Sequence, residues 1–177
     1  MALSLGQRGF DVAVHYNGSA EAADEVAGEI RAMGQNAVTL QADLTVEADM
    51  QRLVPEAAAA LAKPLTLLVN SASIFEYDNV ETATRESWDR HLESNLRAPF
   101  VLTQHFAAQA PEPEISGEWN DATAKALIVN MIDQRVRKLT PEFMTYTIAK
   151  MGLWALTQTS AQALGPKVRV NAIGPGP

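Results

Sequence analysis

The chain of 177 residues contains no cysteine, which excludes disulfide bonds and thiolate zinc sites. An absence of cysteine fits a reducing compartment, so we expect a cytoplasmic protein. Basic residues are also scarce, because 14 Lys and Arg stand against 21 Asp and Glu, for a formal net charge of −7. This charge argues against nucleic acid and against an anionic membrane as partners.

Long apolar runs and metal-ligand patterns are missing too. No stretch approaches the roughly 18 apolar residues of a membrane span. His15, His91 and His105 lack the spacing of metal ligands, so we predict no metal. The first residues lack the basic flank and long apolar core of a signal peptide. An apolar fraction of 47% is enough for a buried core, and we expect a single domain over 1–177.

What is present is an alternation of strand and helix signals. Apolar runs bounded by turn residues predict strands over 10–16, 37–42, 65–70, 126–131 and 168–173. Helical patterns lie between the strands. The first runs from Ser19 to Gly34, and the second follows an N-cap at Thr45 and is expected to kink or break at Pro55. Two longer helices are predicted over 86–109 and 143–164. Residues 1–8 look helical, and residues 110–124 are expected to form a loop. Alternation of this kind predicts an α/β fold, a doubly wound parallel sheet with helices on both faces.

Ligands of such sheets bind outside the carboxyl ends of the strands. The residues at those ends are small or polar: Asn17 to Ser19, Asp43, Asn70 to Ser73, Asp133, and Gly174 to Gly176. The sequence therefore places the candidate site at this edge.

Tyr146 and Lys150 are the central pair of that site. They are four residues apart in a predicted helix, so the phenol and the ammonium share one face. We expect the cation to lower the pKa of the tyrosine, which would then exchange a proton with a substrate near neutral pH. Asp133, after a buried strand, is positioned to orient the tyrosine or to supply a second proton. The Tyr/Lys spacing alone is also typical of an ordinary helix surface.

Taken together, these motifs resemble the short-chain dehydrogenase/reductase family over essentially the whole chain. The matching features are Ala42-Asp43-Leu44, Asn70-Ser71-Ala72-Ser73, Asn95, Tyr146 with Lys150, Arg169-Val170-Asn171 and Gly174-Pro175-Gly176. The resemblance implies a Rossmann-like fold and hydride transfer from a nicotinamide cofactor. It also implies a homotetramer that packs through the helices at about 86–109 and 143–164.

Within this family the chain is most similar to pteridine reductases. Asp133, in Asn130-Met131-Ile132-Asp133, stands where most members carry a serine. The likeness implies that Tyr146 delivers a proton with its hydroxyl held by Asp133, and that Lys150 tunes the tyrosine and binds the nicotinamide ribose. It also implies that Asn95 serves a water-linked proton path, and that Ser73 and Phe75 contact the pterin.

Some of these residues have ordinary structural alternatives. Asn95 could simply cap or kink its helix, Phe75 could be packing at the sheet edge, and Asp43 could be a helix cap. Asp133 could belong to an inactive member that lacks the serine.

The cofactor implied by the resemblance is NADP(H). An acidic residue after the second strand of the family fold would favour NAD, but this chain has Asn17-Gly18-Ser19 there. Ser19 at a helix N-terminus is suited to the 2′-phosphate of NADP, although the usual basic partner is absent at Gly18. The full set of residues expected at the cofactor is Asn17, Ser19, Asp43, Leu44, Asn70, Ser71, Ala72, Lys150, Pro175 and Gly176.

The resemblance is incomplete at both ends. The first strand of the family fold with its glycine-rich turn is missing, and so is the C-terminal part that closes over substrate. We favour a longer natural protein over a truncated copy. The expected function is reduction of a ring C=N bond of a pterin or folate. Two alternatives stay open: a carbonyl or 3-oxoacyl thioester reductase, and an inactive remnant that serves as a binding or subunit module.

Overall fold

The structure is a computed structural model that describes residues 1–119 and 121–176. It contains two compact units, Met1–Pro64 and Leu65–Pro177, and each is described by itself. A single domain over 1–177 stays a sequence prediction.

Unit 1 is built around a pair of parallel strands. Its elements are α1 (Ala2–Gln7), β1 (Val12–Tyr16), α2 (Ala20–Ala32), β2 (Ala37–Gln41) and α3 (Glu47–Ala60). Strands β1 and β2 pair in register from Val12↔Ala37 to Tyr16↔Gln41. Burial of Ala27 and Ile30 on α2 against this pair forms the small core of the unit.

The start of α3 differs from the sequence prediction. Its N-cap is Val46 rather than Thr45, because Thr45 directs its backbone N–H and its hydroxyl to Asp43 Oδ1, 2.8 and 2.7 Å away. Asp43 therefore closes a turn ahead of the helix and does not cap it. Helix α3 also continues through Pro55 without a break.

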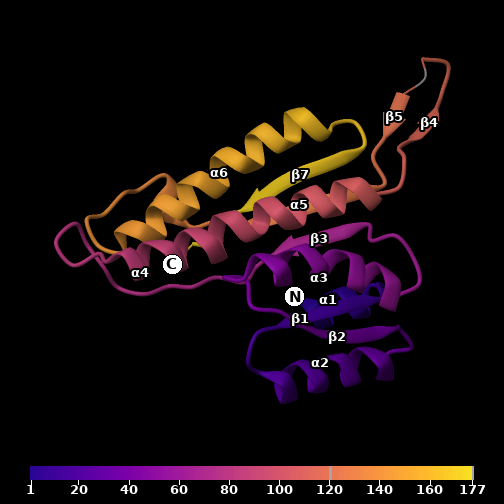
Figure 1. Cartoon of the computed structure of the whole chain (residues 1–177). Coiled ribbons are helices and arrows are strands. Elements are labelled where there is room, and N and C mark those ends of the chain that lie inside the picture. The colour runs from indigo at the N-terminus through magenta and orange to yellow at the C-terminus, as the bar shows by residue number, and fades with distance from the viewer. Residues whose placement is uncertain (120, 177) are drawn as a thin grey trace. The chain divides into compact units, whose positions relative to one another are not determined.

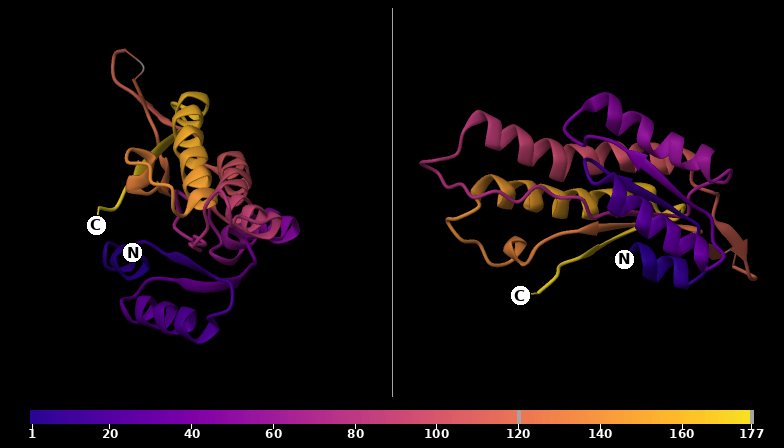
Figure 2. Two further views of the ribbon diagram at one scale, coloured as in Figure 1. Left: turned by 90° about the vertical axis from the view of Figure 1, so that its left-hand side faces the viewer. Right: turned by 90° about the horizontal axis from the view of Figure 1, so that it is seen from below.

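Unit 2 carries a three-stranded parallel sheet in the order β3-β6-β7. Its elements are β3 (Leu67–Asn70), α4 (Arg85–Leu92), the π-helical turn η1 (Glu93–Arg97), α5 (Ala98–Gln109), β4 (Glu114–Ser116), β5 (Asp121–Thr123), β6 (Ala126–Met131), η2 (Gln134–Val136), α6 (Met144–Leu164) and β7 (Val168–Ile173). Helices α5 and α6 lie side by side over one face of this sheet (Figures 1 and 2). The parallel strands and intervening helices confirm the predicted α/β class.

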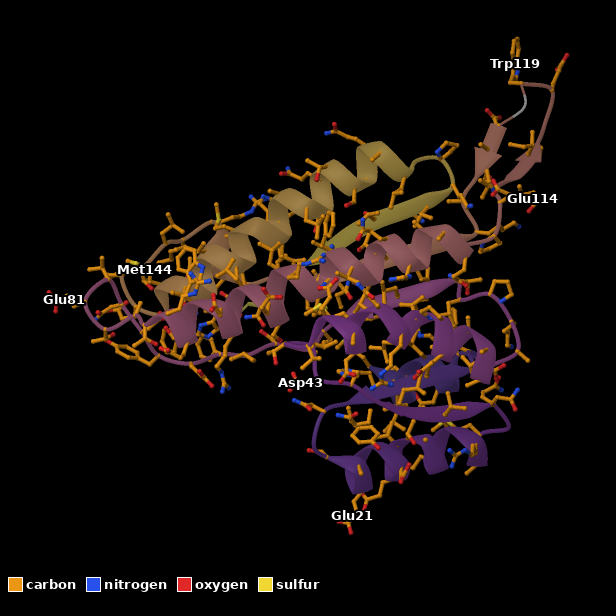
Figure 3. The ribbon with its side chains drawn as sticks, viewed as in Figure 1. Glu21, Asp43, Glu81, Glu114, Trp119 and Met144 are labelled. Atoms are coloured by element: carbon orange, nitrogen blue, oxygen red, sulfur yellow. The ribbon has the colours of Figure 1, made fainter. Side chains whose placement is uncertain are left out.

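The predicted loop over 110–124 is partly wrong, because β4 and β5 form an antiparallel hairpin there. Gly117 supports the turn with φ +80, a conformation that other residues rarely adopt. Figure 3 shows Trp119 at the tip of the hairpin, where 81% of the residue is exposed. All residues of both strands are exposed, and each strand has only three residues, too few for the alternation of polar and apolar residues to reveal it in the sequence.

The helix predicted over 86–109 is interrupted rather than continuous. It begins after a capping box in which Thr84 and Ser87 bond each other's backbone N–H, and it widens into the π-helical turn η1 around Asn95. A wider turn of this kind is common at functional sites. The local reason here is Asn95, whose side chain is fully buried and bonds the segment that follows β3.

Candidate active site

Tyr146 and Asp133 form the central contact of the site. Asp133 follows β6 and its Oδ1 accepts a hydrogen bond of 2.8 Å from the backbone N–H of Arg135, which fixes the carboxylate at the start of η2. The Tyr146 hydroxyl, in the first turn of α6, donates to Asp133 Oδ2 at 3.0 Å. The structure thus brings together two residues that are thirteen positions apart in the sequence.

Lys150 lies one turn further along α6 and is almost completely buried. Its Nζ donates to the carbonyl oxygen of Met131, at the end of β6, over 2.8 Å. The same Nζ lies 5.6 Å from the centroid of the Tyr146 ring. The end of β6 therefore anchors both the ammonium and, through Asp133, the phenol.

Burial governs the protonation of this pair. It raises the pKa of the Tyr146 phenol, and the charge of Asp133 and its hydrogen bond raise that pKa further, while the charge of Arg135 opposes them. Burial lowers the pKa of Lys150 to about 8. The expected lowering of the tyrosine pKa is therefore wrong for this arrangement, because the hydroxyl donates to a carboxylate. The phenol is protonated at neutral pH and is equipped to give a proton.

Asn95 shapes the segment after β3 from within the π-helical turn. Its Oδ1 accepts from the backbone N–H of Ile74 and its Nδ2 donates to the Ile74 carbonyl oxygen, both over 2.8 Å. This pair of hydrogen bonds fixes the chain between Ser73 and Phe75. A water-linked proton path through this turn stays a prediction.

Phe75 lies directly beside the catalytic candidates. Its ring meets the Tyr146 ring edge-on, with centroids 4.7 Å apart, and 52% of the residue is exposed. Burial and Asp133 raise the pKa of Tyr146, and the exposed Ser73 hydroxyl opposes that rise only slightly. Both residues predicted to contact substrate thus border the phenol, and the exposed part of Phe75 is open to a planar molecule.

Two residues of this region were missed by sequence reasoning. Phe143 stacks on Phe75 with ring centroids 4.2 Å apart and planes 8° from parallel, and it adopts φ +54, an uncommon conformation for a bulky residue. The guanidinium carbon of Arg135 lies 4.9 Å from the Phe143 ring centroid and 5.5 Å from that of Phe75. The sequence signal for both was their proximity to Asp133 and Tyr146. Phe143 starts the helix predicted over 143–164, whereas Arg135 lies in a stretch without a predicted element.

The residues predicted at the cofactor lie in both units. In unit 1, Asn17 and Ser19 are exposed, Ser19 is the N-cap of α2 without a side-chain bond to the helix, and Leu44 is buried beside the Asp43 turn. In unit 2 the predicted residues cluster at the carboxyl ends of β3 and β7: Asn70, Ser71 and Ala72, then Pro175 and Gly176.

Two polar groups of unit 2 fit the hydroxyls of a dinucleotide ribose. Asn70 Oδ1 is buried without a hydrogen-bond partner among residues 1–119 and 121–176, so it can accept from a hydroxyl. Lys150 directs one hydrogen bond to Met131 and its ammonium has three N–H donors, so it can donate to a hydroxyl. The donor and acceptor chemistry therefore suits the predicted cofactor.

In the part of the chain that the structure describes, no group of three or more His, Asp or Glu side chains is arranged to hold a metal ion. Nor is any of its helices both long and apolar enough to cross a membrane.

Comparison with known proteins places these features in context. A family model described as short chain dehydrogenase matches residues 1–177. The structure of FolM alternative dihydrofolate reductase 1 from Brucella canis, complexed with NADP, is 41% identical with a TM-score of 0.87; the match covers 99% of this chain and 67% of that one. The Brucella suis protein of the same name, also in complex with NADP, is 41% identical with a TM-score of 0.88, over 99% of this chain and 69% of that one.

A more distant curated relative is 3-oxoacyl-[acyl-carrier-protein] reductase FabG from Staphylococcus aureus strain N315. It is 27% identical over 177 residues, which are 99% of this chain and 68% of the relative. The structural matches confirm a Rossmann-like parallel α/β fold.

Proposed function

Because the chain belongs to the short-chain dehydrogenase family, we propose that it is an NADP(H)-dependent reductase that reduces a ring C=N bond of a pterin or folate. The family makes it an oxidoreductase acting on a small molecule, and NADP(H) is the cofactor supported by the bound neighbours. The pterin substrate is the finer part of the proposal.

The hydrogen bond of 3.0 Å from Tyr146 to Asp133 carries the proposal. When bound, NADPH supplies a hydride to the carbon of the C=N bond. Tyr146 gives its proton to the nitrogen, so that one hydride and one proton convert C=N to CH–NH. The ammonium of Lys150 beside the ring offsets the charge left on the phenol oxygen.

Asp133 and Phe75 favour a pterin over a simple ketone. A carboxylate beside the phenol can take part in moving a proton to a ring nitrogen, which a serine hydroxyl does less readily. The exposed Phe75 ring suits stacking on a planar heterocycle. Identity to the alternative dihydrofolate reductases is also higher, at 41%, than the 27% to the 3-oxoacyl reductase.

A second candidate, reduction of a 3-oxoacyl thioester, is favoured by the curated relatives named 3-oxoacyl-[acyl-carrier-protein] reductase. In that case Asp133 would replace the usual serine without changing the reaction class. An inactive binding or subunit module is the alternative of another kind.

Binding of the cofactor is proposed to use the set predicted from the sequence. Lys150 and Asn70 would bond ribose hydroxyls, and Ser19 would meet the 2′-phosphate. Ser71, Ala72, Asp43 and Leu44 would border the nucleotide, as would Asn17, Pro175 and Gly176.

Assembly as a homotetramer through α5 and α6 is also proposed. Both helices expose large apolar residues, namely Phe100 on α5 and Ile148 and Met151 on α6, and a second copy would cover them. Light scattering on the purified protein gives the mass of the assembly, and a monomer would contradict this part. A cytoplasmic location stays a prediction.

The experiment that tests the function is NADPH oxidation with two substrates, 7,8-dihydropterin and an acetoacetyl thioester. We expect turnover of the dihydropterin and its loss in Tyr146→Phe. Turnover of the thioester alone would replace the pterin assignment by the second candidate. Turnover of neither, together with a melting temperature that NADPH leaves unchanged, would favour the inactive module.

A further inference from the structure

The guanidinium of Arg135 lies among the groups that define the site, yet the proposed reaction gives it no task. It approaches the rings of Phe75 and Phe143 as described above, and its Nη1 lies 3.7 Å from Asp133 Oδ1. The side chain is only 21% exposed, so this cation is largely withdrawn from water. Such a position requires compensating contacts.

Part of the hydrogen-bonding capacity of this guanidinium is unused among residues 1–119 and 121–176. A guanidinium has five N–H donors. In the described part of the chain, Nε is buried and has no hydrogen-bond partner. The contact to Asp133, at 3.7 Å, is an ion pair longer than a hydrogen bond. Buried donors without acceptors are costly, which points to an acceptor from outside the chain.

Charge balance for Asp133 does not explain this geometry. Where arginine serves to neutralise a carboxylate, it commonly forms two parallel N–H···O bonds. Here the bond to Asp133 Oδ1 comes from the backbone N–H of Arg135, and the side chain extends over the aromatic rings instead. The rings hold the cation in place without occupying its N–H donors.

We propose that Arg135 is a substrate-binding residue that donates its N–H groups to a carbonyl oxygen on the edge of a planar heterocycle stacked at Phe75. This inference rests on the proposed function and deepens it. A donor-only side chain selects a ring with an oxygen acceptor over the same ring with an amino group in that position. For pteridines, it selects the 4-oxo over the 4-amino compounds.

Equilibrium binding of three probes to the whole protein, in the presence of NADP, tests this inference. The probes are pterin, which has the 4-oxo group, 2,4-diaminopteridine, which lacks it, and pterin-6-carboxylate, which adds a second acceptor. The variants are Arg135→Gln and Arg135→Lys. The matched control is Arg137→Gln, which removes the same charge from an exposed residue at the end of η2.

In Arg135→Gln, we expect pterin to bind about 10-fold to 100-fold more weakly, because a hydrogen bond from a charged donor is lost. Binding of 2,4-diaminopteridine should change by less than about 3-fold, so that the preference for the oxo compound is lost. Arg135→Lys should recover part of the pterin affinity, because the lysine ammonium keeps the positive charge but not the planar set of donors. Arg137→Gln should bind all three probes as the unaltered protein does.

Equal weakening of the oxo and amino compounds in Arg135→Gln would overturn the inference, because Arg135 would then only support the aromatic rings. Unchanged pterin binding would overturn it as well, while leaving the proposed function intact. A response limited to pterin-6-carboxylate would show that the acceptor is a substrate carboxylate, and the ring-oxygen assignment would be wrong. If the unaltered protein binds none of the three, the pterin function fails together with this inference.

Discussion

Two carboxylates, Asp78 and Asp133, hold neighbouring residues in the first turns of α6, and they do so in different surroundings. Asp78 is 2% exposed and accepts hydrogen bonds from the backbone N–H of Thr145, from the Thr145 hydroxyl and from Ser87. Asp133 has a side chain that is 23% exposed, and it accepts from the Tyr146 hydroxyl and from a backbone N–H.

The difference in burial indicates a structural role for Asp78 and is compatible with the chemical role proposed for Asp133. Burial raises the pKa of Asp78, but the hydrogen bonds from Thr145 outweigh it and hold that pKa below its usual value. His91 extends this network, with Nδ1 2.7 Å from the Thr145 hydroxyl and Nε2 accepting from the backbone N–H of Glu76. A carboxylate with satisfied oxygens and no access to solvent fixes the helix. Asp133 stays partly open to solvent, as its proposed role at a substrate requires.

Removing the phenol hydroxyl tests the chemical half of this comparison and has the largest expected effect. In Tyr146→Phe, dihydropterin reduction should fall by about 100-fold to 10,000-fold, because the proton donor is lost. Tyr77→Phe is the matched control, since its ring also belongs to the aromatic cluster, through an edge-on contact with Phe143. Steady-state NADPH oxidation measures both, and an unchanged rate in Tyr146→Phe would remove Tyr146 from the mechanism.

Removing the two carboxylates one at a time should give opposite results: loss of stability for Asp78 and loss of turnover for Asp133. Asp78→Ala should lower the free energy of unfolding by about 2–4 kcal/mol, because the buried donors of Thr145 and the partly buried hydroxyl of Ser87 lose their acceptor. Asp133→Ala should cost less than about 1 kcal/mol of stability while reducing turnover sharply. Urea unfolding followed by circular dichroism, with rates measured on the same samples, separates the effects. Equal stability losses would show that both carboxylates are structural.

The proposed catalytic half of this comparison was visible in the sequence and the structural half was not. Asp133 and Tyr146 stand at fixed places beside predicted elements, a strand that ends and a helix that begins, so topology alone brings them together. Asp78 lies in a stretch without a periodic pattern, 67 residues from Thr145. A contact of that separation between irregular chain and helix leaves no local signal.

The fold shows the same division between local and long-range signals. Strand β6 has the predicted bounds because it is a largely apolar run, and β7 has them because its apolar residues alternate with Arg169 and Asn171. The π-helical turn at Asn95 was not foreseen, because it depends on a hydrogen bond to Ile74, 21 residues away. The direction of the Tyr146 pKa shift also depends on burial, which composition does not specify.

Substitutions of Phe143 test the aromatic cluster beside Asp133 and have a smaller expected effect. Its φ of +54 is costly for phenylalanine and is maintained by the stack on Phe75. Asparagine tolerates this conformation better than phenylalanine but lacks the ring. Alanine lacks the ring and does not tolerate the conformation well either. We expect Phe143→Asn to be about 1 kcal/mol more stable than Phe143→Ala, and both to bind pterin more weakly. Equal stability of the two variants would mean that the backbone conformation relaxes once the ring is gone.

Lys150 provides the smallest predicted effect, a dependence of stability on pH that Asp78 does not share. Its pKa is lowered from 10.5 to about 8 by burial, so between these values the unfolded chain binds more protons than the folded one. Stability should therefore rise with pH, by about 1 kcal/mol between pH 8 and pH 9. Asp78 is ionised throughout this range because its pKa is lowered, and it adds no slope.

Urea unfolding of the protein without cofactor, at intervals from pH 7.5 to 9.5, measures this slope. Lys150→Met supplies the comparison, because it fills a similar volume without a titrating group and should lose the rise. Tyr146 does not disturb this window, since its raised pKa begins to contribute only as the unfolded phenol titrates near its ordinary value of about 10. A slope identical in the two proteins would show that Lys150 keeps its proton in the folded chain. Its hydrogen bond to Met131 would then outweigh the burial.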